Sequence, residues 1–297
     1  ASINDLELGD IARGREIQAE LEAATAGLHD FYDILTAGPL LDEDFRALEI
    51  EADQIIEGDL ATRTAAALGS ARAAARAQAA LHWRLAFPTV YLRRDRPGFD
   101  VILGNPPWEE VTVERLGFYA RHLPGIKSVK PQTEQARRIA EFEATYTTVR
   151  ERYEAELAEK QALRRYLAAR YTLTRSGDPD LYKAFAERFL DVVRQGGHLG
   201  VVLPRSAFAG DGTAPFRERL LGSAKTTSMD VLLNSGGWVF PDAEHRYTIV
   251  LLAAKLGQAT ERHLSVSAVV DSRERFDKVD QERTEWPLEQ LRVPHPD

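Results

Sequence analysis

Short apolar runs alternate with helical stretches after residue 98, and this alternation restricts the fold more than any other feature. Four runs have the length and β-branched content of buried strands. They occupy residues 99–104, 198–203, 229–233 and 246–254. Helical periodicity separates them, as over residues 181–194 and 216–221. Strands alternating with helices predict an α/β fold with a mostly parallel sheet covered on both faces, in which the last pair could be antiparallel.

The first 81 residues have a different character. Periodic, Ala-rich stretches with few β-branched residues predict helices, and helix propensity is strongest in the Ala/Arg segment at 61–81. We expect this N-terminal helical region to be a small bundle or an arm packed on a larger domain.

A long helical insertion is predicted between the first two strands. Residues 109–133 are expected to be loop-like, and one long helix is expected from Glu134 because apolar residues then recur every three or four positions. This stripe consists of Ile139, Phe142, Tyr146, Val149, Tyr153 and Leu157. Further along, Gly196-Gly197 is expected to end the helix at 181–194.

Composition excludes several classes of protein. The absence of Cys excludes a disulfide scaffold and thiolate metal sites, and the seven scattered His do not favour a zinc site, so no metal is expected. No apolar run is long enough to span a membrane, and the acidic N-terminus lacks a signal peptide, so we expect a cytoplasmic protein with no membrane contact. The net charge of −8 argues mildly against nucleic-acid binding over the whole surface, but a local basic patch remains compatible with it.

The most informative motif is Asn105-Pro106-Pro107-Trp108, which directly follows the first predicted strand. Ligands of open α/β sheets bind at the carboxyl ends of strands. The Asn105 side-chain oxygen and the Pro106 carbonyl are suited to accept both hydrogens of a planar amino group, and two prolines keep these acceptors rigid. Trp108 offers a flat face on which a base could stack. These residues predict a pocket for an extruded adenine; the plain alternative is a rigid turn with a core tryptophan.

Several blocks in the same order resemble the gamma-class N6-adenine DNA methyltransferases, especially the large restriction-enzyme (type IIG-like) and phage-exclusion types. The blocks are residues 82–88, 98–108, 180–185, 196–204 and 239–252. The resemblance implies a partial Rossmann-like methyltransferase sheet, its catalytic half, and methyl transfer from S-adenosylmethionine to an extruded adenine in double-stranded DNA within a restriction-modification or phage-defence system. It also implies that Phe240 stacks on the base opposite Trp108, and that Asp180 and Tyr182 approach the cofactor.

The expected organisation follows from these blocks. It comprises the helical region at 1–81, the catalytic part of a methyltransferase domain at 82–257 with the insertion at 109–175, and a C-terminal extension at 258–297. The insertion is locally basic just after the motif, and phosphate contacts are plausible there. The four candidates are Arg115, Arg121, Lys127 and Lys130.

The sequence departs from the family in two places. The glycine-rich donor loop that the family carries upstream of its catalytic block is not found in residues 1–97, and the residues after Gly257 are too few for a target-recognition domain. The chain starts with Ala, and its one Met is Met229. We therefore expect a piece of a longer enzyme; the alternatives are a subunit whose partner supplies the donor site, or a degenerate domain that only binds DNA or a partner.

Other substrates also remain open. Asn-Pro-Pro-aromatic motifs serve enzymes that methylate protein glutamine or RNA bases, since these substrates also present a planar amino group. The DNA recognition sequence, a fused or partner nuclease and the oligomeric state cannot be read from the sequence.

Overall fold

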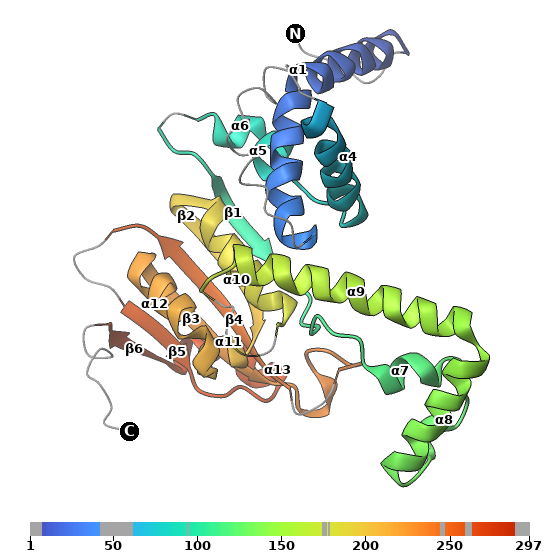
Figure 1. The fold of residues 1–297 in the computed structure, drawn as a ribbon. Helices are drawn as coiled ribbons and strands as arrows, with labels where there is room; N and C mark the ends of the chain where they lie inside the picture. Colours follow the sequence, from blue (N-terminus) through green and yellow to red (C-terminus); the bar gives the residue numbers. More distant parts are fainter. Residues whose placement is uncertain are drawn as a thin grey trace. The chain divides into compact units, whose positions relative to one another are not determined.

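The computed structural model describes residues 8–41, 62–93, 95–173, 177, 179–243, 247–258 and 263–288. It forms two compact units that divide the chain between Thr89 and Val90 (Figure 1). We refer to residues 1–89 as the helical unit and to residues 90–297 as the sheet unit.

The helical unit is built on two packed helices. Its described helices are α1 (Leu8–Leu41), α4 (Thr62–Ala77) and α5 (Trp83–Ala86), and α6 (Pro88–Tyr91) lies where the two units meet in sequence. Small and aliphatic side chains fill the contact between α1 and α4, namely Ile34, Ala37, Leu68 and Ala71. Beside them Arg72 donates from Nε and Nη2 to the two carboxylate oxygens of Asp30, each at 2.6 Å. A paired arrangement of this kind orients the two helices more specifically than alanine contacts do.

The sheet unit contains a six-stranded mixed sheet, which confirms the α/β class. The strands are β1 (Phe99–Gly104), β2 (Val193–Pro204), β3 (Ala224–Leu233), β4 (Thr248–Leu256), β5 (His263–Ser267) and β6 (Arg283–Pro287). Their order is β1-β2-β4-β3-β5-β6. This strand order, in a mixed sheet that packs against helices, is consistent with a partial Rossmann-like methyltransferase fold.

The expectation of a mostly parallel sheet was wrong. Only the β1–β2 and β3–β5 pairs are parallel, whereas β2–β4, β3–β4 and β5–β6 are antiparallel. The reason is that β4 turns back after β3 and inserts between β2 and β3. The antiparallel arrangement considered for the last predicted pair, β3 and β4, is confirmed.

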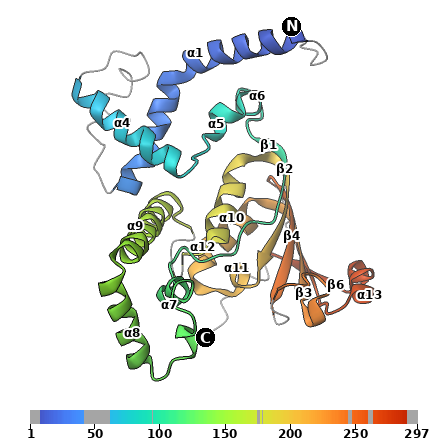
Figure 2. The ribbon, with the colours of Figure 1, turned by 90° about the vertical axis from the view of Figure 1, so that its right-hand side faces the viewer.

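Helices cover one face of this sheet (Figure 2). They are α10 (Leu181–Val192), α11 (Ser206–Ala209) and α12 (Ala214–Ser223), with the short turn η2 (Asp211–Thr213) between the last two. Alternate residues of the central strands point into this layer, for example Leu199, Val201 and Leu203 of β2, each at most 3% exposed. The opposite face carries η3 (Ser235–Gly237), α13 (Arg273–Phe276) and η4 (Val279–Gln281), which enclose a smaller cluster around Ile249 and Val270.

The glycine pair does not end a helix, contrary to expectation. The helix α10 stops at Val192, and Gly196-Gly197 lies inside β2, where the pairing with β1 jumps from Val193 to His198. Gly196 has a φ of +74°, and a Cβ on Gly197 would lie 2.9 Å from the Arg194 carbonyl oxygen. Glycine is therefore required by a bulge in a strand, which a residue-by-residue pattern does not distinguish from a helix end.

The insertion also differs in detail from the prediction. The segment expected to be loop-like contains α7 (Arg115–Ala120) and η1 (Ile126–Ser128), and the single helix expected from Glu134 is two helices, α8 (Gln132–Thr145) and α9 (Thr147–Arg170). The chain bends at Tyr146, whose φ of −115° and ψ of 71° are not helical. The bend lets both helices pack on one aromatic cluster, to which Ile139, Phe142, Val149 and Tyr153 of the predicted stripe belong.

The described residues after Gly257 add two strands to the sheet. Within this segment β5 pairs with β3, and β6 pairs with β5. Arg283 of β6 donates from Nε and Nη2 to both carboxylate oxygens of the buried Asp230 in β3, at 2.8 Å and 2.6 Å. This ion pair links the outer strands to the centre of the sheet.

At the opposite side, β1 is the edge strand of the described sheet. Asp100 at its start accepts hydrogen bonds from Arg194 Nε at 2.6 Å and Arg93 Nη1 at 2.9 Å. These two guanidinium groups lower the pKa of the Asp100 carboxyl to about 2. Asp100 thus has a structural role, because it anchors the edge strand through these two arginines.

Acid should weaken this anchor in a defined range of pH. Because the folded-state pKa is lowered from 3.8 to about 2, the stabilisation is complete above the unfolded value and is lost as the pH falls through about 2. We expect Asp100→Asn to lower the thermal midpoint at pH 6 and to match the unmodified protein near pH 2. Asp95→Asn, whose side chain is 79% exposed, serves as the control. A difference of equal size at both pH values would contradict the assignment.

Candidate active site

The predicted motif occupies the loop that leaves the edge strand β1. Gly104, the last residue of β1, lies against the Phe189 ring of α10, and a Cβ there would be only 3.1 Å from Cζ of that ring. After Trp108 the chain pairs with the start of α10: Leu181 N donates to the Glu109 carbonyl at 2.9 Å, and Val111 N donates to the Pro179 carbonyl at 3.0 Å. The loop is therefore held at both of its ends, and the two prolines restrict its middle.

A second loop, between β3 and β4, faces the motif. It is organised by Asn234, a fully buried residue at the end of β3. The Asn234 side-chain oxygen accepts hydrogen bonds from the backbone N–H groups of Val239 (3.1 Å) and Phe240 (3.0 Å), and its amide nitrogen donates to the Phe240 carbonyl at 3.0 Å. Trp238 Nε1 also donates to the Leu233 carbonyl, at 2.7 Å. These bonds fix the loop that presents Phe240.

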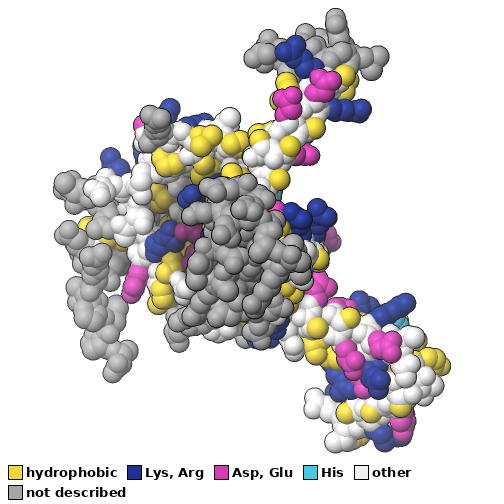
Figure 3. All heavy atoms as spheres, turned by 45° about the horizontal axis from the view of Figure 1, so that its top comes forward, with side chains coloured by type: hydrophobic (Ala, Val, Ile, Leu, Met, Phe, Trp, Pro, Cys, Tyr) yellow, Lys and Arg dark blue, Asp and Glu magenta, His cyan; other side chains and the backbone are white. Residues whose placement is uncertain are grey.

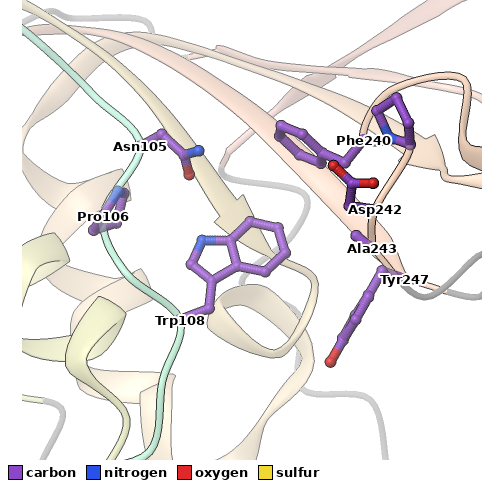
Figure 4. A pocket seen from close by; sticks show the side chains of 8 residues that line it. Asn105, Pro106, Trp108, Phe240, Asp242, Ala243 and Tyr247 are labelled. Carbon is purple, nitrogen blue, oxygen red and sulfur yellow. The ribbon is translucent and has the colours of Figure 1, made fainter.

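The two loops enclose a cavity of about 480 Å³ (Figure 4). Its lining residues are Asn105, Pro106, Trp108, Phe240, Pro241, Asp242, Ala243 and Tyr247. The volume is within the range of small-molecule sites. The structure thus brings together Asn105, Pro106, Trp108 and Phe240, which come from two segments more than 130 residues apart; Pro107, although part of the same loop, does not line the cavity.

Three aromatic side chains line the cavity, those of Trp108, Phe240 and Tyr247. The Trp108 and Phe240 ring centroids are 6.5 Å apart with an angle of 88° between the planes, and those of Trp108 and Tyr247 are 6.3 Å apart at 73°. In this geometry a flat ligand that stacks on Trp108 does not also lie parallel to Phe240 or Tyr247. A sandwich between Trp108 and Phe240, as the resemblance implies, requires one ring to turn.

Two polar groups of the motif stand out. The Asn105 side chain is exposed and points toward the space between the two loops, and it has no hydrogen-bond partner among the described residues (Figure 4). Trp108 Nε1 is buried and has no partner within the described parts of the chain either. Buried groups without partners are rare in folded proteins and occur often at functional sites.

Sequence reasoning missed Asn234, Asp242 and Tyr247. The sequence does contain a signal for Asn234: like Asn105, it is a polar residue that directly follows a predicted strand, and Ser235-Gly236-Gly237 comes next. The sequence contains no such signal for Asp242 and Tyr247, because their loop reaches the motif only through the position of β4 beside β2.

The two residues predicted to approach a cofactor lie beside the motif but are engaged elsewhere. The Asp180 carboxylate is 3.5 Å from Lys183 Nζ, and the buried Tyr182 hydroxyl is hydrogen-bonded to Ser206 Oγ at 2.8 Å. Neither side chain lines the aromatic cavity. Their role toward a cofactor stays a prediction.

The four basic residues predicted to contact DNA all lie on the insertion, and two of them are in ion pairs. Arg115 donates to Glu143 at 2.8 Å, and Arg121 donates to Glu156 at 3.4 Å while its guanidinium lies 4.7 Å from the centre of the Phe118 ring. Lys127 and Lys130 are exposed. Basic and acidic side chains are interspersed over the insertion (Figure 3). Arg115 and Arg121 therefore help to hold the insertion together, and contact with DNA stays a prediction for all four.

The described residues do not fit S-adenosylmethionine. Its sugar and amino acid parts need a loop whose backbone is not obstructed by side chains. Of the described glycines before β1, those of residues 8–41 lie within α1, Gly69 lies within α4, and Gly98 directly precedes the strand. Asp180 and Tyr182, which the resemblance places near the cofactor, are engaged with Lys183 and Ser206.

Two further properties concern metals and membranes. No group of three or more His, Asp or Glu side chains in the described part of the chain is arranged to hold a metal ion. None of the described helices combines the length and the apolar character needed to cross a bilayer.

No protein-family model and no curated protein matches the sequence. Among solved structures, the chain is similar to DrdV in a DNA complex (13% identity, TM-score 0.39, 64% of this chain covered). It is also similar to the type ISP restriction-modification enzyme LlaBIII bound to DNA (12%, 0.35, 63%) and to the type IIG restriction endonuclease BpuSI (15%, 0.30, 44%). This chain spans 17%, 12% and 17% of the length of those three chains, respectively. The solved structures that it resembles thus include restriction-modification enzymes.

Proposed function

We propose that the aromatic cavity captures an adenine extruded from double-stranded DNA, as the acceptor site of an S-adenosylmethionine-dependent adenine-N6 methyltransferase of a restriction-modification or phage-defence system. The observation that supports this most is the Asn105 side chain, which projects from a rigid Pro-Pro loop into a cavity walled by Trp108, Phe240 and Tyr247. An acceptor amide beside flat apolar walls suits a planar ring that carries an amino group.

Asn105 has a defined chemical role in this proposal. Its side-chain oxygen and the Pro106 carbonyl each accept one hydrogen of the adenine amino group. This withdraws the nitrogen lone pair from conjugation with the ring and makes the nitrogen more nucleophilic. Both acceptors are fixed before the base arrives, so little reorganisation is needed when charge develops on that nitrogen. A bound donor would supply the methyl group, with its S–CH3 bond breaking as the N–CH3 bond forms, and the surplus proton on the nitrogen would pass to solvent, so no side chain with an unusual pKa is needed.

Trp108 has the second role. A base stacked on an aromatic ring gains about 1–3 kcal/mol, which offsets the cost of removing it from the duplex. The Phe240 ring is nearly perpendicular to Trp108. In this proposal the Trp108 face supports the base and Phe240 forms a side wall of the cavity.

S-adenosylmethionine enters the proposal as the donor that the sequence resemblance implies. The described residues offer it no site, so a donor-binding region from outside them, or from a partner subunit, completes the enzyme in this proposal. The same lack of a donor site favours a second candidate, a degenerate domain that captures bases without transferring methyl groups.

The two candidates separate in a transfer assay. The protein, together with the region or subunit that supplies the donor site, is incubated with tritiated S-adenosylmethionine and one of three acceptors: unmethylated phage DNA, which contains every short sequence, bulk RNA, or a glutamine-containing peptide. We expect label in the DNA, released as N6-methyladenine after digestion. Label in RNA or peptide alone would overturn the DNA assignment. Adenine capture without transfer to any acceptor would favour the degenerate domain.

Replacement of Trp108 tests base capture without a donor. A duplex with adenine opposite an abasic site is a suitable probe, because this adenine is extruded at low cost. We expect the protein to prefer this probe to a fully paired duplex, and Trp108→Ala to reduce the preference about tenfold, as the loss of one stacking contact implies. Fluorescence anisotropy measures both affinities.

Trp286→Ala is the matched control, since Trp286 lies on β6, is 44% exposed and does not line the cavity. An equal loss of preference in both variants would contradict a stacking role for Trp108.

A further inference from the structure

The Trp108 ring is spaced for a stacked base but is not oriented for one. Its centroid lies 6.5 Å from that of Phe240 and 6.3 Å from that of Tyr247, and the ring planes differ by 88° and 73°. Two parallel rings that hold a flat base between them are about 7 Å apart, because each pair of stacked rings is separated by roughly 3.5 Å. The distance between Trp108 and Phe240 therefore nearly fits a bound base, and only the angle between their planes does not.

No hydrogen bond among the described residues holds Trp108 in this orientation. Its Nε1 is buried without a partner, and its backbone forms no hydrogen bond in the same part of the chain. A buried N–H group without a partner adds to the free energy of the state that contains it. A turn of the ring that exposes Nε1 to water recovers part of that cost. The present orientation of Trp108 is thus held by packing alone.

Phe240 is restrained more strongly than Trp108. Asn234 accepts a hydrogen bond from the Phe240 N–H group and donates one to the Phe240 carbonyl, both at 3.0 Å. One fully buried side chain thus engages both backbone polar groups of Phe240. A change in the angle between the two rings therefore comes most easily from Trp108, whose unpaired N–H group gains a partner by turning.

Tyr247 restrains Trp108 in addition to lining the cavity. The residue directly precedes β4, and its carbonyl accepts a hydrogen bond from the Asn234 N–H group at 3.0 Å, which fixes its backbone. Aromatic rings that meet at nearly a right angle attract each other through the quadrupoles of their π systems. Because this attraction depends on the angle between the planes, the Tyr247 ring stabilises the present orientation of Trp108 relative to a turned one.

We propose that Tyr247 is a positioning residue: it holds Trp108 in a closed orientation, and the extruded adenine is captured when the Trp108 ring turns parallel to Phe240. The inference rests on the proposed function and adds a closed and an open state to its cavity. A protein that is mostly closed binds its ligand with an affinity reduced by the fraction that is open. Tyr247 therefore opposes the capture of a base, although its ring forms part of the cavity wall.

Removal of the Tyr247 ring tests this opposition. The full protein and the variants Tyr247→Ala, Tyr247→Phe and Phe240→Ala are each titrated with the abasic-site probe and with the fully paired duplex. The preference is the ratio of the two affinities of one preparation, so an unfolded fraction of a variant cancels. We expect Tyr247→Ala to raise the preference about three- to tenfold, as the loss of one edge-to-face contact implies. Tyr247→Phe keeps the ring and should restore the unmodified value, whereas Phe240→Ala should lower the preference.

The other outcomes have definite meanings. A preference that falls or stays unchanged in Tyr247→Ala would show that Tyr247 serves only as a wall, and would overturn the inference while the proposed function stands. A rise of equal size in Tyr247→Phe would assign the effect to the hydroxyl instead of the ring contact, and would also overturn it. If neither the unmodified protein nor any variant prefers the abasic-site probe, adenine capture itself fails, and the proposed function is removed together with the inference.

Discussion

Replacing Asn105 with alanine is expected to lower methyl transfer to adenine by at least 10²-fold while leaving affinity for DNA nearly unchanged. The side chain is exposed within the cavity and has no partner in the described part of the protein, so its removal does not disturb the fold. What is lost is one of two fixed acceptors for the amino group. Loss of a single preorganised hydrogen-bonding group at a reacting centre typically costs 10²–10³-fold in rate.

The measurement compares initial rates of label transfer to unmethylated phage DNA under saturating donor. Asn105→Asp is an informative companion, because it keeps an oxygen acceptor at the same position and should retain more activity than Asn105→Ala. Equal activity of the alanine variant and the unmodified protein would contradict the role assigned to this side chain. A parallel loss of DNA affinity in Asn105→Ala would point to a positioning role instead.

Replacing Asn234 with alanine is expected to destabilise the sheet unit by about 3 kcal/mol and to remove adenine capture. The fully buried Asn234 side chain makes three hydrogen bonds to the backbone of Val239 and Phe240. Truncation leaves two N–H groups and one carbonyl without these partners, and each unpaired buried group costs roughly 1–3 kcal/mol. The loop that carries Phe240 then loses its fixed position.

Urea denaturation followed by tryptophan fluorescence measures the loss of stability, because Trp238 lies in the same loop. Ser235→Ala is the control, since Ser235 is the exposed neighbour of Asn234 and lies in the same short turn. A stability change below about 1 kcal/mol in Asn234→Ala would contradict the proposed organisation of the loop, and unchanged preference for the abasic-site probe would show that Phe240 does not close the cavity.

Most differences between the predicted and the observed fold concern which strands or helices contact one another, and not whether a strand or helix is present. Each predicted strand exists, because a run of β-branched and aliphatic residues is a local signal. The relative direction of neighbouring strands is not encoded in the local sequence. The strand β4 lies between β2 and β3 and is antiparallel to both, although it follows β3 directly in sequence. The bend at Tyr146 has the same origin, since a continuous apolar stripe is compatible with one helix or with two that share a cluster.

For the candidate site, the sequence by itself determined the group that meets the substrate. Asn105, the two prolines and Trp108 are consecutive, so their proximity and rigidity follow from covalent structure. Only the tertiary structure decided what faces them: the loop that carries Phe240, and the Asn234 side chain that supports this loop. The contacts of Trp108 with Phe240 and Tyr247 join residues more than 130 positions apart. Such separations are closed by sheet order and core packing, which no short sequence pattern records.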